Sequence, residues 1–313
     1  MNNSLIPRHY SAYRGEISKL FELSKGKKFL DLTLGDGGHT EEALKAGCRV
    51  VSVDVDPEAI ERALSFVPDN FKSIVIDIDS LPSSIDQDFN WLIIRTNFEK
   101  IGEIAQKLNL PKFDGIMVDL GPSQFQILSP DRGFSFQTDE PLDMRLDKNL
   151  GVTAKDLVNA LNEGELANLF LLGDETWAKP MAKAIVKTRT LRPITTTKQL
   201  ADLVYSVKKG KPGRIHPATQ VFMALRMAVN LEREVIENLL PQLPGLMNTN
   251  GILGVISFHS GEDRLVKDFI KQSEEKNILS AINQKPIEPT LEELKISPRT
   301  RSAKLRLARK IVK

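Results

Sequence analysis

Along the first half of the chain, short apolar runs alternate with segments whose apolar positions recur at helical spacing. One helix is expected from about Thr40 to Ala46, and Asp56 and Pro57 open another, since proline is tolerated in a first helical turn. Five apolar runs have the length of buried strands, at residues 28–32, 49–53, 91–94, 115–119 and 251–258. Strands that alternate with helices predict a parallel sheet covered on both faces.

A further apolar run at residues 73–76 competes with residues 91–94 for the place of the third strand. Four aspartates lie after the first of these runs: Asp77, Asp79, Asp86 and Asp88. We take residues 91–94 as the core strand and assign residues 73–76 to an insertion. Two more strand-like runs lie near the end of the chain, at residues 278–285 and 303–311.

The middle of the chain, about residues 153–209, has helical patterns without intervening strands. Thr153 and Asp156 resemble a capping box, and one long helix is predicted over residues 218–240. The predicted fold class is therefore α/β, with a mostly parallel, Rossmann-like sheet interrupted by a helical insertion domain. We place the sheet domain at residues 1–147 and 218–313, and the helical domain at residues 148–217.

The composition is that of an ordinary soluble globular protein of 313 residues, 41% of them hydrophobic and 27% charged. The chain has no apolar run of about 18 residues, so no membrane-spanning helix is expected. The single cysteine, Cys48, cannot form an internal disulfide, which suits the reducing cytoplasm.

The net charge of +2 conceals an uneven distribution. Residues 1–150 carry 17 Lys and Arg against 24 Asp and Glu, whereas residues 151–313 carry 26 against 17. Between Lys179 and Arg226 there are 11 basic residues and one acid, and residues 297–313 hold seven basic residues and no acid. A single block could be a solvated face, but two blocks favour a nucleic-acid partner. The candidate RNA-binding residues are Lys208, Lys209, Lys211, Arg214, Arg299 and Arg301.

A glycine-rich turn follows the first predicted strand and reads GDGGHT at residues 35–40. Asp54 ends the next strand, where a carboxylate can accept hydrogen bonds from both ribose hydroxyls. The dinucleotide fingerprint G-x-G-x-x-G fails because its third glycine would fall on Thr40. A nucleoside without a pyrophosphate fits better than NAD, and S-adenosyl-L-methionine is the common cofactor of this kind. A plain turn after a strand is the alternative interpretation.

The residue types present restrict the chemistry. Methylation at pyrimidine C5 needs a thiolate nucleophile, and the one thiol, Cys48, precedes the second strand, away from the strand end at Asp119. Methylation of an exocyclic amine needs only polar acceptors that hold the amine in line, and the segment from Asp119 to Ser123 can supply them. The four histidines show no paired metal-ligand spacing, so no metal is expected.

Several long motifs together resemble the bacterial 16S rRNA (cytosine N4)-methyltransferase family. They occur in the same order over nearly the whole chain: GDGGHT at 35–40, DLGPS at 119–123, RGFSFQTDEPLDMRLD at 132–147, GRIHPATQVFMALRMAVN at 213–230, ISFHSGEDRLVK at 256–267 and SPRTRSAKLR at 297–306. The resemblance implies a class I methyltransferase sheet and methylation of a cytosine amine in the decoding region of 16S rRNA, within the small ribosomal subunit. The chain would act in the cytoplasm, alone or as a homodimer.

The resemblance also implies site residues. The family's cofactor contacts match Gly37, Gly38, His39, Asp54, Phe98, Asp119 and Gln126. For catalysis, we expect Asp119 and Ser123 to hold the target amine, and Asp143 and His259 to shape the cytosine pocket. Two alternatives stay open: His39 could organise the backbone rather than contact the cofactor, and Asp143 could form a structural ion pair with Arg145.

Two other classes of protein remain as alternatives. Departures from the family pattern at Pro122, Gln124 and Gly261 leave room for a non-enzymatic RNA-binding or assembly protein on a degenerate methyltransferase fold. A nucleotide-dependent oxidoreductase on a similar sheet is the other alternative, and the missing third glycine argues against it.

Overall fold

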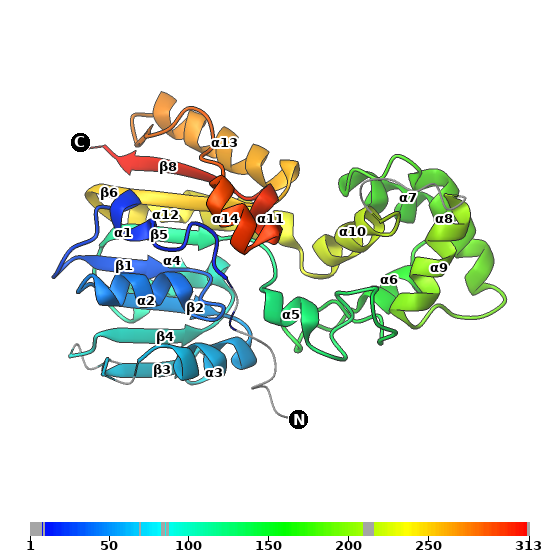
Figure 1. The fold of residues 1–313 in the computed structure, drawn as a ribbon, viewed down its shortest axis with the longest axis horizontal. Coiled ribbons are helices and arrows are strands. Elements are labelled where there is room, and N and C mark those ends of the chain that lie inside the picture. The colour runs from blue at the N-terminus through cyan, green and yellow to red at the C-terminus, as the bar shows by residue number, and fades with distance from the viewer. Residues whose placement is uncertain are drawn as a thin grey trace. The chain divides into compact units, whose positions relative to one another are not determined.

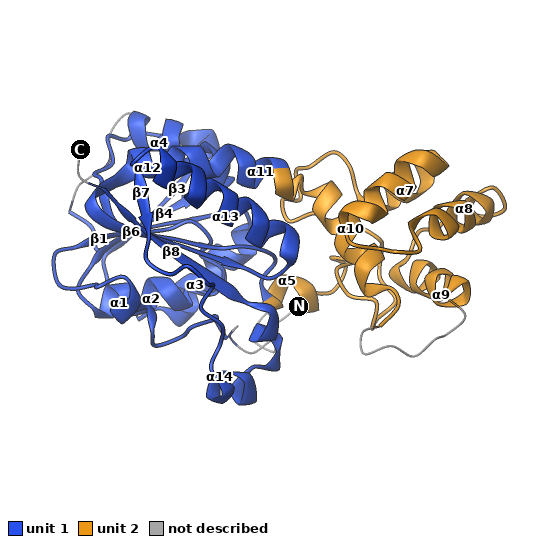
Figure 2. Ribbon diagram, turned by 90° about the horizontal axis from the view of Figure 1, so that it is seen from above, with its two compact units in different colours: residues 1–123, 234–313 blue, residues 124–233 orange. Residues whose placement is uncertain are grey.

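The computed structural model describes residues 8, 10–68, 70–82, 85, 88–208 and 216–311. The chain divides into two compact units, coloured separately in Figure 2. A sheet unit comprises residues 1–123 and 234–313, and a helical unit comprises residues 124–233. No helix among the described residues is long and apolar enough to span a membrane.

The sheet unit is built on eight strands in the order β3-β4-β2-β1-β5-β6-β8-β7, which Figure 1 shows from β3 at the bottom to β8 near the top. Among the described strands, β8 runs opposite to the other seven. The strands are β1 (Lys28–Asp31), β2 (Arg49–Asp54), β3 (Ser73–Asp77), β4 (Trp91–Arg95), β5 (Phe113–Asp119), β6 (Met247–Ser257), β7 (Leu279–Ala281) and β8 (Lys304–Lys310). The predicted α/β class with a mostly parallel, Rossmann-like sheet is confirmed.

Successive side chains of the central strands bury opposite faces of the sheet. Leu30 of β1 belongs to one hydrophobic core, whereas the adjacent Phe29 belongs to the other. Helices α1 (Ile17–Leu20), α2 (Gly38–Lys45) and α3 (Pro57–Phe66) cover the face of Phe29. Helices α4 (Ile101–Lys107), α11 (Glu232–Leu239), α12 (Leu243–Leu246) and α13 (Ser260–Glu275) cover the face of Leu30, and α14 (Leu291–Ile296) precedes β8. Central strands covered on both faces read as continuous apolar runs, which is why they were predicted correctly.

The structure corrects the assignment of residues 73–76 to an insertion. They form β3, which pairs in parallel with β4 along its whole length. As the edge strand, β3 is only partly buried, and Val75 is 50% exposed. A weakly buried edge strand gives a weaker apolar signal than β4, which is buried from Trp91 to Ile94.

The helical unit contains α5 (Gln124–Leu128), α6 (Ala154–Ala160), α7 (Glu163–Leu172), α8 (Ala178–Arg189), α9 (Thr197–Val207) and α10 (Thr219–Val229). The predicted capping box at Thr153 and Asp156 is present, and Asn162 and Glu165 form a second one at the start of α7. Phe170, Met181 and Leu200 are fully buried in a separate hydrophobic core. The second unit therefore has a core of its own.

The helical unit is wider than the predicted residues 148–217. Leu142 and Met144 before that range and Leu225 after it are buried in the helical core. The predicted helix over residues 218–240 is two helices, because α10 ends at Val229 and Leu231 adopts a left-handed backbone, with φ 49°. Asn230 at the break accepts a hydrogen bond from the Leu146 N–H at 2.7 Å and donates one to the Met144 carbonyl at 2.8 Å. These long-range contacts have no signature in the local helical pattern.

Candidate active site

The glycine-rich turn joins β1 to α2 at the carboxyl edge of the sheet. Gly35 and Gly37 have φ of +50° and +74°, in the left-handed region that glycine adopts without a Cβ penalty. A Cβ on Gly38 would lie 2.0 Å from the Ser11 hydroxyl oxygen, so the following glycine is required by close packing. The turn therefore exposes backbone, and not side chains, to anything that approaches this edge.

Asp54 ends β2 beside this turn and holds its backbone. One carboxylate oxygen accepts a hydrogen bond from the Gly35 N–H at 2.9 Å, and the other accepts from the Asp56 N–H at 2.9 Å. Burial raises the pKa of Asp54 to about 7, although these two backbone N–H groups oppose the shift. Each carboxylate oxygen can accept a second hydrogen bond, so the position can also serve a diol such as ribose.

Asp119 ends β5, the neighbour of β1 on the other side from β2. Its backbone N–H donates to the Thr33 hydroxyl at 2.7 Å, which ties the two strand ends together. The carboxylate oxygen Oδ1 is buried and has no hydrogen-bond partner among the described residues, and burial raises the pKa of Asp119 to about 7. A buried acceptor without a partner is uncommon in a folded protein and marks a place where a ligand N–H would be stabilised.

His39 is 3% exposed and lies in the first turn of α2. Its Nε2 is 2.8 Å from the Ala12 carbonyl oxygen, so the side chain holds the N-terminal segment. The same segment is fixed at Tyr13, whose N–H donates to Glu293 at 2.9 Å and whose hydroxyl donates to the Ile287 carbonyl at 2.7 Å. Of the two interpretations of His39, the structure shows the backbone-organising contact.

Three other predicted residues also lie in the sheet unit. Phe98 begins a short 3-10 helix (Phe98–Lys100) after β4, and the Thr96 N–H nearby donates to the Asp54 carbonyl at 2.9 Å. Ser123 lies near the turn, since a Cβ added to Gly35 would be 3.9 Å from the Cβ of Ser123. His259 caps α13 after β6, with Nε2 3.1 Å from Glu262. Phe98 and Ser123 thus lie along the edge that carries Asp54 and the turn, and His259 follows the strand next to β5.

One buried ion pair in the turn was not predicted. Asp36 and Arg62 have side chains 1% and 5% exposed, and Arg62 donates to both carboxylate oxygens at 2.9 and 2.8 Å. Their separation of 26 residues leaves no local spacing signal. The pair anchors the turn to α3, the helix that follows β2.

A buried chain of polar side chains beneath the turn was also missed. The Thr40 hydroxyl donates to Asp31 at 2.7 Å and lies 2.7 Å from the Ser52 hydroxyl, which accepts from the Trp91 indole at 2.9 Å. Burial raises the pKa of Asp31, the acidic end of this chain. An aspartate at the end of an apolar strand was the only signal available in the sequence.

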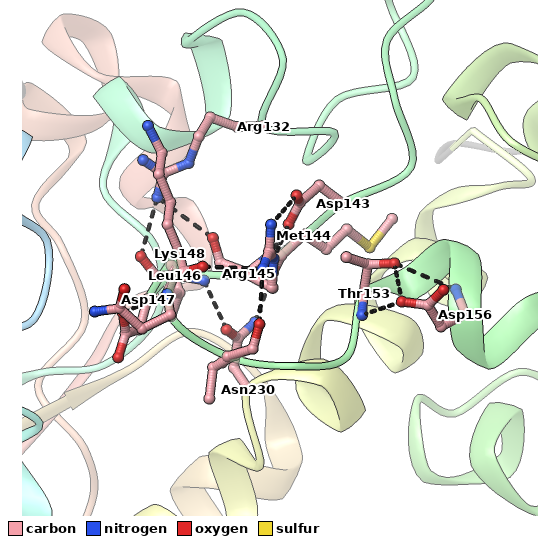
Figure 3. A network of polar contacts seen from close by, with 12 residues as sticks. Arg132, Asp143, Met144, Arg145, Leu146, Asp147, Lys148, Thr153, Asp156 and Asn230 are labelled. Atoms are coloured by element: carbon pink, nitrogen blue, oxygen red, sulfur yellow. Dashed lines mark hydrogen bonds and ion pairs between the residues drawn. The ribbon is translucent and has the colours of Figure 1, made fainter.

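Two predicted site residues belong to the helical unit. Gln126 lies on α5 and is 5% exposed. Asp143 accepts two hydrogen bonds from the Arg145 guanidinium, each at 2.8 Å, and Arg145 also donates to the carbonyls of Lys148 and Leu150 (Figure 3). Burial opposes ionisation of Asp143, but the Arg145 hydrogen bonds dominate and lower its pKa. The structural ion pair is therefore the arrangement that the structure shows.

The predicted RNA-binding residues have different environments. Lys208 donates to buried Glu175 at 2.7 Å and to the Pro217 carbonyl at 3.0 Å, which gives it structural partners within the helical unit. Arg299 and Arg301 are exposed on the short 3-10 helix before β8. Lys209, Lys211 and Arg214 lie outside the described residues.

Comparison with known proteins gives the family. Three proteins named Ribosomal RNA small subunit methyltransferase H are similar to this chain. The protein from Sulfurihydrogenibium sp. (strain YO3AOP1) is 38% identical over 97% of this chain and 99% of its own length. Those from Gloeothece citriformis (strain PCC 7424) and Leptospira interrogans serovar Lai (strain 56601) are each 40% identical over 98% of this chain, and over 96% and 90% of their own lengths. The model of the MraW methylase family matches residues 7–311, and the chain belongs to this family.

Proposed function

We propose that the protein transfers the methyl group of S-adenosyl-L-methionine to the exocyclic N4 amine of a cytosine in the decoding region of 16S rRNA. Family membership and the names of the relatives support an rRNA methyltransferase of the small subunit. The observation that carries the chemistry is the buried Oδ1 of Asp119, to which no residue that the structure describes donates a hydrogen bond. It lies at the sheet edge where Asp54 holds the glycine turn.

The residues at this edge fit the cofactor. Asp54 would accept hydrogen bonds from the ribose hydroxyls, and the turn through Gly37 and Gly38 would approach the nucleoside closely. Phe98 would contact the adenine side of the site, and His39 would keep the N-terminal segment in place. Asp119 and Gln126 complete the proposed cofactor-binding set. The cofactor supplies an electrophilic methyl group on a sulfonium.

The chain's own residues would orient the amine and receive its proton. The lone pair of a cytosine amine is delocalised into the ring, so acceptors must hold the N–H groups while the nitrogen attacks. Asp119, with the backbone and hydroxyl of the loop from Gly121 to Ser123, would provide them. When the new N–C bond forms, the nitrogen loses one proton, and the Asp119 carboxylate would accept it. A pKa of about 7 suits a group that exchanges protons near neutral pH.

His259 would shape the cytosine pocket at the sheet edge, and Asp143 would act through the position of Arg145 within the helical unit. The exposed Arg299 and Arg301 and the basic residues of the helical unit would contact phosphates of 16S rRNA in the small ribosomal subunit. Such a substrate implies work in the cytoplasm, which suits a chain with one cysteine. The protein would work alone or as a homodimer, and light scattering of the purified protein would distinguish the two by its molar mass.

The test is methyl transfer from tritiated S-adenosyl-L-methionine to small ribosomal subunits, followed by mass spectrometry of the nucleosides. We expect N4-methylcytidine with the native protein. For Asp119→Asn, we expect at least a hundredfold loss of kcat, in keeping with the 10²–10⁴-fold that general bases typically contribute. Binding of S-adenosylhomocysteine should be measured for both proteins, so that loss of the cofactor is not mistaken for loss of chemistry.

Near-normal turnover of Asp119→Asn would remove Asp119 from the mechanism. Tight cofactor binding without transfer to any RNA would instead favour the non-enzymatic assembly protein. Stabilisation by NAD and not by S-adenosyl-L-methionine in a thermal-shift assay would favour the oxidoreductase.

A further inference from the structure

A cavity of about 370 Å³ lies within the helical unit, apart from every residue proposed above for catalysis or cofactor binding. Its volume is within the range of about 300–1,000 Å³ that small-molecule sites occupy. Aromatic and charged side chains line it together, among them Phe136, Asp139, Lys198, Asp202, Tyr205 and His216. All of these residues belong to residues 124–233, so the cavity is a property of one unit.

The aromatic side chains form a stacked platform in this cavity. The rings of Phe136 and His216 stack with centroids 4.4 Å apart and planes inclined by 24°. Phe222, 4% exposed, supports Phe136 from its edge at 5.0 Å and 78°. His216 is exposed, and Tyr205, which lines the same cavity, is 51% exposed. Exposed rings on a buried aromatic support are what a planar ligand needs for stacking.

The position of the His216 ring is fixed by hydrogen bonds at the start of α10. Its Nδ1 accepts from the Ala218 N–H at 3.2 Å, and its carbonyl accepts from the Thr219 N–H at 3.0 Å. Since Nδ1 accepts, the neutral ring carries its proton on Nε2. The stack is therefore preorganised, and a ligand would not have to order it.

The charges in the cavity indicate which part of RNA it accepts. Asp202 is the one acid between Lys179 and Arg226, a segment with 11 basic residues, and it lines the cavity together with Asp139 and one cation, Lys198. Two carboxylates against one ammonium group leave the cavity with a net negative charge, which disfavours a phosphate, and the carboxylates accept hydrogen bonds from the N–H groups of a base. Single-stranded RNA is read in this way, by stacking on aromatic rings and hydrogen bonding at the base edge.

We propose that this cavity binds one unstacked base of the RNA substrate, other than the cytosine that is methylated. The base stacks on the His216 side of the platform or against Tyr205, and its edge donates to Asp139 or Asp202. Guanine fits best, because its N1–H and N2 amine present two adjacent donors to one carboxylate. Uracil fits worst, because carbonyl oxygens flank its single N–H. The inference rests on the proposed rRNA substrate.

The test uses the full-length protein and hexamers of single-stranded RNA that contain one thienoguanosine, a fluorescent guanosine analogue that keeps the N1–H and the N2 amine and whose fluorescence falls when it stacks on an aromatic ring. We expect quenching with the native protein. His216→Asn keeps an acceptor for the Ala218 N–H but removes the ring, and should weaken binding by about 5- to 100-fold, the range of one base–aromatic stack. His216→Phe keeps the ring and should retain most of the quenching. Trp177→Ala removes an exposed aromatic of the same unit outside the cavity, and should change nothing.

A second measurement separates this inference from the proposed function. In methyl transfer to small ribosomal subunits, His216→Asn should raise KM for the subunit with little change in kcat. Asp202→Asn should reduce the protein's preference for hexamers that contain guanine over hexamers that contain uracil. If the native protein methylates small subunits but His216→Asn and Trp177→Ala show the same hexamer quenching and the same KM for the subunit, the cavity proposal is wrong and the proposed function stands. If small subunits are not methylated at all, the proposed function fails, and quenching that depends on His216 would still identify a base-binding cavity.

Discussion

Removal of the Arg62 guanidinium should destabilise the sheet unit at its glycine turn. In Arg62→Met the long side chain is kept but its charge is lost, and Asp36, with a side chain 1% exposed, would lose the guanidinium that donates to both of its carboxylate oxygens. Arg62 also lies over the ring of Phe66, 5.1 Å from its centroid, and this contact would be weakened as well. The turn that Asp36 belongs to is the one proposed to approach the cofactor.

The size of the effect follows from the burial of the pair. Removing one partner of a buried ion pair costs about 3–5 kcal/mol, because the other charge stays buried without compensation. The sheet unit comprises residues 1–123 and 234–313, a size at which 1 kcal/mol corresponds to about 2–4 °C in Tm. Arg62→Met should therefore lower Tm by roughly 6–20 °C. The double variant Asp36→Leu/Arg62→Met removes both charges and should recover much of this loss, since apolar replacement of a whole pair is often neutral.

Differential scanning calorimetry should compare Arg62→Met, the double variant and a surface control with the native protein. The control is Arg95→Met, which breaks the pair with Asp77, where the side chains are 28% and 34% exposed; it should cost about 0–1 kcal/mol. Titration with S-adenosylhomocysteine should show weaker binding for Arg62→Met only. The reasoning is refuted if Arg62→Met costs no more than Arg95→Met, or if the double variant is no more stable than Arg62→Met.

Further predictions concern cofactor binding and the helical unit. Burial raises the pKa of Asp54 to about 7, so its neutral form stabilises the folded free protein below pH 3.8, and this contribution is lost as the pH rises through about 7. Since ribose hydroxyls donate to the carboxylate, the affinity for S-adenosylhomocysteine should increase by up to about tenfold for each unit that the pH rises toward 7, and should stay constant above pH 7. Calorimetry that shows the same pH dependence for Asp54→Asn would contradict this. Gly38→Ala places a Cβ 2.0 Å from the Ser11 hydroxyl oxygen and should lower the free energy of unfolding by about 1–3 kcal/mol, measured by chemical denaturation. Adding Ser11→Gly should restore part of this loss, and no recovery would mean that the clash is not the cause. Arg145→Ala removes two hydrogen bonds to Asp143 and two to backbone carbonyls. It should destabilise the helical unit by about 1.5–3 kcal/mol, measured by hydrogen exchange of α6, and should leave the Kd for S-adenosylhomocysteine unchanged. A changed Kd would show that the role of Arg145 extends beyond the helical unit.

The amino-acid sequence by itself determined the fold class and most of the core strands, and it predicted where the proposed site lies. Buried parallel strands read as continuous apolar runs, so residues 28–32, 49–53, 91–94 and 115–119 were identified correctly from local pattern. The glycine turn and Asp54 were also predictable, because both lie directly after strands whose carboxyl ends share one edge. The motifs that resemble the methyltransferase family gave the expected cofactor and substrate.

Only the tertiary structure decided which of these side chains form hydrogen bonds or ion pairs with distant residues. His39 contacts the Ala12 carbonyl, Lys208 pairs with buried Glu175, and Arg62 of α3 pairs with Asp36 in the turn before α2. Pairs separated by 26 to 33 residues leave no periodic signal in the sequence. The burial that raises the pKa of Asp119 likewise depends on segments distant in the sequence, and within the described part of the chain none of them supplies a partner for its Oδ1. Local pattern specifies where a strand ends, but desolvation and pairing at that end depend on what the rest of the fold brings to it.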